Sequence, residues 1–250
     1  LAGVSKEIDS NDIPALIKEV CDTLESLCTV TKVRAFQKPE SFEALNLILE
    51  DSFKSNDQGA VFSACSILAT VVPQLDEAPV TTRKLLAHCV LALQLFSDHE
   101  IQMKILKGSR ALFERAASER QMLTNSLPMA YIRLFRSGKL AIQSAAADAL
   151  CAYAAKISTP IIVVRCLLQI VKTQVLNVSS TVLNAIITII KTIKIDQNEC
   201  DECIEALHPL FKHQKIAMRE LAATGISSTL LSSPIELLVE KVLGNSIINF

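Results

Sequence analysis

A short phrase occurs three times in this chain at regular spacing. Each copy has a Leu-Phe pair, then a short polar turn, and then a new run of apolar residues, and the copies begin at Leu95, Leu134 and Leu210. The first two copies are 39 residues apart and the last two are 76 apart, about twice 38, which is the period of a repeat made of two helices. The spacing therefore predicts an all-α chain of stacked helix pairs.

The composition agrees with buried helices rather than sheets. Half of the residues are apolar and the mean hydropathy is +0.36, while only 6 Gly and 8 Pro occur among 250 residues, too few turn formers for a sheet of many strands. Aromatic residues make up 4% of the chain and Trp is absent, so the predicted core consists of interdigitated Leu, Ile, Val and Ala side chains.

Apolar periodicity and capping residues predict five helix pairs, with one further helix at each end. The single helices span about 13–28 and begin at Ser233-Pro234, and an irregular segment is expected near 117–125. Asp57 and Asp98 are the predicted N-caps of two second helices. The pairs are predicted at about 40–54 and 58–72, 80–96 and 99–117, 126–136 and 139–157, 160–175 and 178–194, and 199–212 and 215–231.

No Gly/Ser-rich or low-complexity segment divides the chain. Residues 1–250 are therefore predicted to form a single continuous helical-repeat domain. Since the sequence does not begin with Met, we expect it to be a fragment of a longer chain.

Two of the predicted second helices resemble helix B of HEAT and armadillo repeats, in which a V-R-x-x-A-A-x-A-L phrase packs small residues against the next helix. Residues 139–150 read KLAIQSAAADAL and residues 215–226 read KIAMRELAATGI. The resemblance implies a right-handed α-solenoid of about five to six two-helix HEAT-like or armadillo-like repeats, with Ala146 and Ala222 facing neighbouring helices. The period favours HEAT, the irregular segment leaves armadillo open, and the lack of Trp argues against importin-type armadillo grooves, which carry Trp and Asn ladders.

Charge is distributed unevenly along the chain. Residues 101–194 carry 13 Lys and Arg against 3 acidic residues, a net charge of +10, whereas residues 1–100 and 195–250 carry net charges of −7 and −4. Such a field attracts an acidic partner to the central repeats. The alternative is a solvated surface whose charges only keep the protein soluble.

Several basic residues fall at the turns within the predicted pairs, and stacked repeats should align these turns along one edge. We predict that this edge binds a partner through Arg136, Lys139, Lys172, Lys212 and Lys215. The arrangement is similar to the tubulin-binding edge of TOG domains, which are HEAT solenoids. Those domains usually present an aromatic residue on the first turn, whereas here the first turn is Ser55-Asn56-Asp57, so a TOG-like tubulin-binding or microtubule-binding domain is kept as an alternative.

No residue pattern predicts a catalytic, cofactor or metal site. Cys200, Cys203, His208 and His213 would point in different directions on one helix and so could not close on a single zinc ion. Lys107-Gly108-Ser109 lacks the upstream glycine of a phosphate-binding loop and is predicted inside a helix. The remaining cysteines fall on apolar stripes, as expected of reduced core residues, which favours the cytoplasm or nucleus.

The sequence thus predicts a non-catalytic protein-protein interaction scaffold without cofactors, whose partner presents an acidic surface or segment. Nucleic acid ranks lower because only Phe113, Tyr131, Phe135 and Tyr153 could stack on bases within the basic middle. No apolar run is long enough to span a membrane. A regulatory subunit, or an enzyme fragment with a site on the concave face, is the other alternative.

Overall fold

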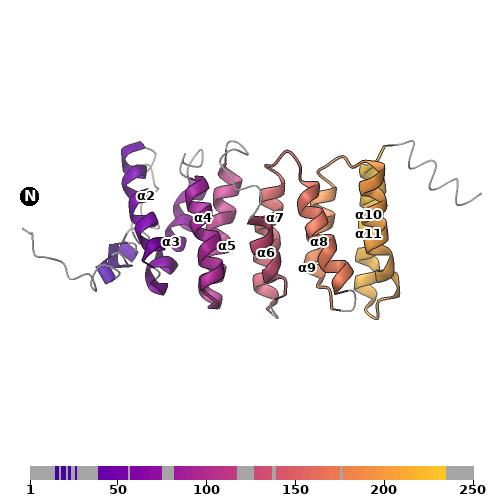
Figure 1. The fold of residues 1–250 in the computed structure, drawn as a ribbon, viewed down its shortest axis with the longest axis horizontal. Coiled ribbons are helices and arrows are strands. Elements are labelled where there is room, and N and C mark those ends of the chain that lie inside the picture. Colours follow the sequence, from indigo (N-terminus) through magenta and orange to yellow (C-terminus); the bar gives the residue numbers. More distant parts are fainter. Residues whose placement is uncertain are drawn as a thin grey trace, which may run out of the picture. The chain divides into compact units, whose positions relative to one another are not determined.

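The structure is a computed structural model, and it describes residues 39–55, 57–74, 82–116, 127–136, 139–174 and 177–234, together with scattered positions between 15 and 26. Every regular element within these ranges is a helix (Figure 1). The chain divides into two compact units, unit 1 (Leu1–Ala130) and unit 2 (Tyr131–Phe250). Each unit is described by itself.

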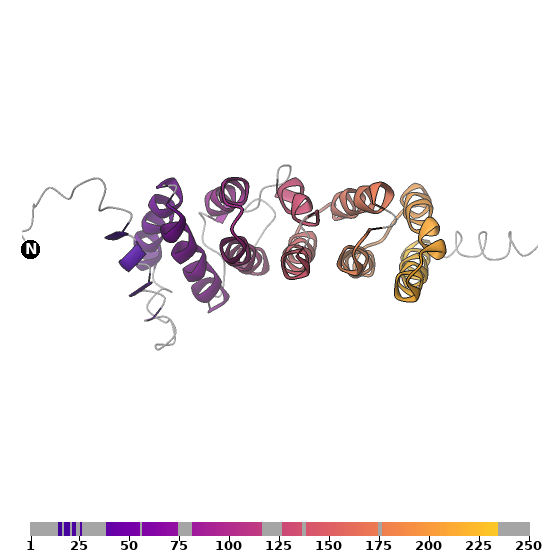
Figure 2. The same cartoon turned by 90° about the horizontal axis from the view of Figure 1, so that it is seen from below.

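Unit 1 contains two consecutive helix pairs that pack in two layers. The first helices of the pairs, α2 and α4, contact each other, and the second helices, α3 and α5, form the other layer. Figure 2, which looks along the helices, shows both layers end-on. The elements are α2 (Pro39–Lys54), α3 (Gln58–Val71), the 3₁₀ helix η2 (Val72–Gln74), α4 (Thr82–Leu95) and α5 (His99–Arg115).

Unit 2 repeats this arrangement. The second helices α7, α9 and α11 pack side by side, and the first helices α8 and α10 pack against each other. Helix α6 (Leu127–Leu134) crosses the boundary between the units. The other elements are α7 (Leu140–Ala154), α8 (Ile161–Thr173), α9 (Ser180–Ile190), α10 (Gln197–Leu207), the 3₁₀ helix η4 (His208–Lys212) and α11 (Ile216–Ser232).

All five predicted helix pairs are present, and their ends lie within four residues of the prediction except at the end of α10. One predicted helix was wrong in detail, because residues 199–212 form α10 followed by η4. Pro209 has no N–H to donate to the carbonyl of Glu205, so the α-helix tightens into a 3₁₀ turn at His208. Helix α10 also begins earlier than predicted, at a capping box that Asp196 makes with Glu199.

Helix α9 ends at Ile190, four residues before the predicted end. The amides of Thr192 and Ile193 bond to carbonyls three residues back, and the Thr192 hydroxyl donates to the carbonyl of Ile189 at 2.7 Å. These local bonds replace the α-helical pattern. Described positions between 15 and 26 are helical, as predicted, whereas the irregular segment at 117–125 and the last helix after Pro234 lie outside the described residues.

Small residues let the helices of each unit approach closely. Ala146 and Ala222 are fully buried, as predicted. A Cβ at Gly108 would lie 3.1 Å from the Cβ of Leu68 across the α3–α5 contact, and a Cβ at Gly225 would lie 2.9 Å from Leu207. Since real Cβ contacts are longer, these two glycines set the spacing between neighbouring helices.

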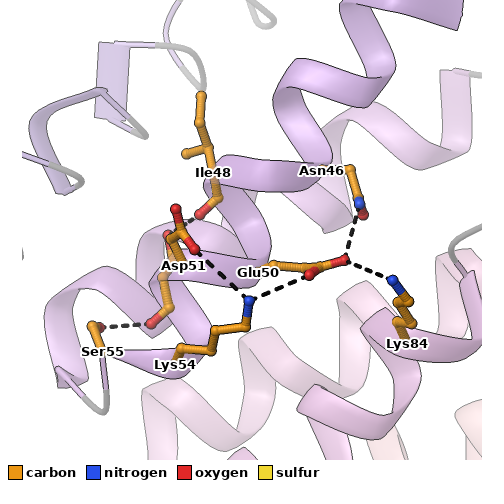
Figure 3. A network of polar contacts seen from close by, with 8 residues as sticks. Asn46, Ile48, Glu50, Asp51, Lys54, Ser55 and Lys84 are labelled. Atoms are coloured by element: carbon orange, nitrogen blue, oxygen red, sulfur yellow. Dashed lines mark hydrogen bonds and ion pairs between the residues drawn. The ribbon is translucent and has the colours of Figure 1, made fainter.

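The first-helix layer of each unit is joined by ion pairs. In unit 1, Lys84 on α4 lies 3.8 Å from Glu50 on α2 (Figure 3). In unit 2, Arg165 on α8 lies 2.9 Å from Glu202 on α10. Arg165, from the basic middle of the sequence, is thus paired with an acidic residue of the C-terminal part on this layer.

Candidate partner-binding surface

The five predicted binding residues all belong to unit 2, and all are exposed. They lie at the turns within the helix pairs, and these turns lie together at the lower ends of the unit 2 helices in Figure 1. We call this end of unit 2 the turn edge. Arg136 follows α6, Lys139 is the N-cap of α7, Lys172 is in the last turn of α8, Lys212 ends η4 and Lys215 is the N-cap of α11.

Lys172 forms an ion pair within unit 2. Its ammonium lies 3.3 Å from a carboxylate oxygen of Glu205 on α10, whose side chain is 77% exposed. Exposed pairs of this kind are weak. Lys172 therefore contributes less net positive charge to the turn edge than its position in the sequence suggests.

The second helices of the two units begin differently. In unit 1, the Asp57 carboxylate accepts from the amide of Ala60 at 2.8 Å, and the Asp98 carboxylate accepts from the amides of Glu100 and Ile101. Both predicted caps are thus confirmed. In unit 2, no N-cap side chain of α7, α9 or α11 makes such a bond, and the caps are Lys139, Ser179 and Lys215.

This difference makes the turn edge of unit 2 positive in two ways. The first amides of a helix have no partner within the helix, and the helix dipole places partial positive charge there. An aspartate neutralises that charge in unit 1, whereas Lys139 and Lys215 add to it in unit 2. A carboxylate on another molecule is the complementary ligand.

Apart from the caps, the turns of the two units share one hydrogen bond. The residue four positions after the N-cap donates its side chain to a carbonyl of the preceding turn. The bond recurs in both units, although its acceptor lies two residues before the N-cap in the turns that precede α5 and α11 and four residues before it in the turn that precedes α7. The bonds are Gln102 to Phe96 at 3.1 Å, Gln143 to Phe135 at 3.0 Å and Arg219 to His213 at 3.0 Å.

His213 has a structural position beneath the turn edge. It is buried, and its Nδ1 accepts from the amide of Lys215 at 3.1 Å. Its carbonyl is also the acceptor for Arg219. The imidazole thus holds the backbone of the η4–α11 turn in place, which positions Lys212 and Lys215 at the surface.

Three large apolar side chains lie exposed beside these cations, and sequence reasoning missed them. Leu140 and Ile216, the first residues of α7 and α11, are 64% and 63% exposed, and Phe211 is 40% exposed. The sequence pattern that could have predicted two of them is an apolar residue directly after a lysine N-cap, because the side chain of the first helical residue can point away from the neighbouring helices. The turn edge therefore combines positive charge with apolar surface.

The residues considered for zinc do not converge in the described part of the chain, where no group of three or more His, Cys, Asp or Glu could hold a metal. Cys200 and Cys203 are buried, while His208 is exposed. Burial, with nearby Glu202 as a smaller cause, raises the pKa of the Cys203 thiol to about 12. That thiol stays protonated at neutral pH, which disfavours metal ligation.

Other cysteine and aromatic predictions have mixed outcomes. Cys65 and Cys89 are buried as predicted, but Cys151 and Cys166 are only partly buried, since they lie at the margins of the apolar faces of α7 and α8. The aromatic residues of the basic middle are all buried, which leaves none of them available to stack on a base: Phe113, Tyr131, Phe135 and Tyr153. Lys107-Gly108-Ser109 lies within α5, as predicted.

Within the described residues, none of the helices has both the length and the apolar character needed to cross a membrane.

No family model matches the sequence, and no curated protein matches it. The structure is similar to a designed armadillo repeat protein in complex with the peptide (KR)4, with a TM-score of 0.60 and 12% identity over 90% of this chain and 95% of that chain. It is also similar to another designed armadillo repeat protein, with a TM-score of 0.58 and 11% identity over 90% and 96% of the two chains. An engineered protein of the Northeast Structural Genomics Consortium has a TM-score of 0.58 and 14% identity over 91% and 94%.

These similarities show the fold class that the repeated phrase predicted. The chain has an all-α, armadillo/HEAT-type helical-repeat fold.

Proposed function

We propose that this protein is a non-catalytic scaffold that binds a partner protein through the turn edge of unit 2, and that the bound surface or segment of the partner is acidic. The observation that carries the proposal is the replacement of aspartate caps by Lys139 and Lys215 at helix N-termini whose amides have no side-chain cap. Arg136 and Lys212 extend the positive surface to the adjoining turns.

The fold supports a binding role in general terms. Repeat solenoids present extended surfaces on rigid elements, and one structural neighbour is a designed armadillo repeat protein in complex with the basic peptide (KR)4. For the present chain we expect a ligand of opposite charge to that peptide, because the positive turn edge is complementary to carboxylates.

The test is a binding titration of the whole chain with a fluorescent glutamate-rich peptide and with purified tubulin at several salt concentrations. Exposed charges are screened beyond about 8 Å at physiological ionic strength, so affinity should fall steeply as salt rises. Reversing Arg136→Glu and Lys139→Glu should slow association and leave the helical circular dichroism unchanged.

The matched control is the pair Lys191→Glu and Lys194→Glu. Both lysines are exposed and follow the C-terminal end of α9, so they lie at the end of unit 2 opposite the turn edge, and the change in net charge is the same. Equal loss of binding in the two double variants, or binding that survives high salt, would contradict the proposal. Salt-sensitive binding of tubulin but not of the peptide would favour the TOG-like alternative.

A further inference from the structure

The exposed apolar residues of the turn edge occur in two groups, each next to cations. The first group, which we call clamp 1, contains Lys139 and Leu140 at the start of α7. The second, clamp 2, contains Lys215 and Ile216 at the start of α11, with Phe211 and Lys212 from η4 beside them. In both clamps a lysine N-cap is followed directly by a large aliphatic residue that is more than 60% exposed.

These aliphatic residues leave most of their surface in water, since Leu140 is 64% exposed and Ile216 is 63% exposed. The residue two positions after Leu140 is Ile142, and the residue two positions after Ile216 is Met218. Both are buried, with exposed fractions of 1% and 4%. The buried faces of α7 and α11 are therefore formed by residues other than Leu140 and Ile216. Covering an exposed leucine or isoleucine side chain with a partner removes apolar surface from water, which favours association.

We propose that the two clamps together bind one extended acidic segment of a partner protein, in which each of two aliphatic side chains is flanked by carboxylates. This inference rests on the proposed function and specifies the chemistry of the partner. The carboxylates face Lys139, Lys212 and Lys215, and the aliphatic side chains cover Leu140, Phe211 and Ile216.

The spacing of the clamps sets the spacing within the segment. Helices α7 and α11 are both neighbours of α9, so their starts are separated by two helix-to-helix steps. Packed helices lie about 8–10 Å apart, which places the clamps about 16–20 Å from each other. An extended chain rises about 3.3 Å per residue, so the two aliphatic residues of the segment should be about five to six residues apart.

Charge and apolar surface together favour a peptide over a nucleic acid. Phosphates would satisfy the lysines, but bases bind by stacking on exposed aromatic side chains. Clamp 1 has no aromatic residue, and in clamp 2 Phe211 is less exposed than the aliphatic Ile216, at 40% against 63%. Acidic side chains beside aliphatic ones satisfy both components of the surface.

The experiment measures dissociation constants of the whole chain for three synthetic labelled peptides. The matched peptide contains two Glu-Leu-Glu triplets whose leucines are about six residues apart, in an otherwise Gly/Ser sequence. A second peptide has both leucines replaced by serine, and a third places the leucines only about three residues apart. We expect the matched peptide to bind about tenfold more tightly than either of the others.

The variants separate this inference from the proposed function. Leu140→Ser with Ile216→Ser should weaken binding of the matched peptide about tenfold and leave the serine peptide unaffected. Lys139→Glu with Lys215→Glu should weaken all three peptides, whereas Lys191→Glu with Lys194→Glu should weaken none by a comparable factor. Helical circular dichroism should be the same for all variants, because every substituted side chain is exposed.

The clamp inference would be overturned if the matched and serine peptides bound with equal affinity and the double variant Lys139→Glu/Lys215→Glu bound neither. The proposed function would then still stand. Failure of every acidic peptide to bind would overturn both. Tight binding of a single-stranded oligonucleotide that is unchanged in Leu140→Ser with Ile216→Ser would also overturn the clamp inference, because it would show that charge alone determines the ligand.

Discussion

In unit 1 the second helices begin with Asp57 and Asp98, and in unit 2 the second helices α7 and α11 begin with Lys139 and Lys215. The turns share one hydrogen bond, since a side chain at the fourth helical position bonds to a turn carbonyl in α5, α7 and α11. One position of the repeat thus satisfies helix amides in one unit and presents a cation to solvent in the other. The comparison indicates that the N-cap of the second helix can be a lysine instead of an aspartate while the helix pair keeps its fold. The helix then lacks the capping bond, and the surface gains a positive charge.

The largest effect is expected from close helix packing, which is a feature of each unit. Replacing Ala222 with Leu should lower the free energy of unfolding by about 1–3 kcal/mol, because the fully buried site on α11 has no room for the larger side chain. Ala223→Leu is the matched control, since Ala223 is exposed on the same helix. Chemical denaturation of both variants measures the difference, and equal stability would show that the assigned packing face of α11 is wrong.

The same variant tests whether the two units unfold together. The prediction of a single continuous domain implies that Ala222→Leu, in unit 2, also lowers amide hydrogen-exchange protection in α3 of unit 1. Loss of protection confined to unit 2 would contradict that prediction and indicate two independently folding parts.

A smaller effect is expected from removing a cap in unit 1. Asp98→Ala should lower the free energy of unfolding by about 1 kcal/mol, because the amides of Glu100 and Ile101 lose their acceptor. Asp98→Asn keeps an oxygen in place and should be close to the parent protein. If the alanine and asparagine variants had the same denaturation midpoint, the cap would not contribute as the structure indicates.

The opposite change in unit 2 should have the opposite sign. Lys215→Asp supplies the missing cap of α11 and should raise the free energy of unfolding by about 0.5–1 kcal/mol, while weakening binding of an acidic peptide. Lys212→Asp makes the same change in charge away from the N-cap and should not stabilise the protein. Thermal denaturation and peptide titration of both variants measure the two effects. Destabilisation by Lys215→Asp would contradict the claim that α11 lacks a stabilising N-cap side chain.

The smallest effect concerns pH and is confined to unit 1. Burial lowers the pKa of His88 below its ordinary value of 6.5, against the opposing influence of Glu50, and the ring stacks on Phe53 at 5.6 Å. As pH falls below 6.5, the unfolded chain binds a proton that the folded chain resists, so the free energy of unfolding should decrease. His88→Phe should remove this slope in denaturation midpoints measured between about pH 7.5 and 5.5, a range around the ordinary histidine pKa.

Glu50 provides a second, separate pH window. Burial alone would raise its pKa, but the hydrogen bond from Asn46 and the charges of Lys84 and Lys54 outweigh burial and lower the pKa below 4.5 (Figure 3). The stabilisation from this network should therefore be present above pH 4.5 and be lost as pH falls below that value. Glu50→Gln should flatten the dependence there and leave the histidine window intact, and an unchanged slope would contradict the assignment.

The sequence by itself determined the helix pairs, the aspartate caps and the burial of Ala146 and Ala222. These features follow from local rules, because helical periodicity and capping involve residues within about four positions of each other. The largest departures were the ends of α10 and α9, where Pro209 and short local bonds replaced the α-helical pattern.

The tertiary structure decided which distant charges pair across helices. Lys172 and Glu205 are 33 positions apart and Arg165 and Glu202 are 37 apart, so their pairing depends on α8 and α10 being neighbours in space. It also decided that Leu140 and Ile216 stay exposed while Ile142 and Met218 are buried. An apolar residue in a sequence indicates a helix face, but only the positions of the neighbouring helices determine whether that face is covered.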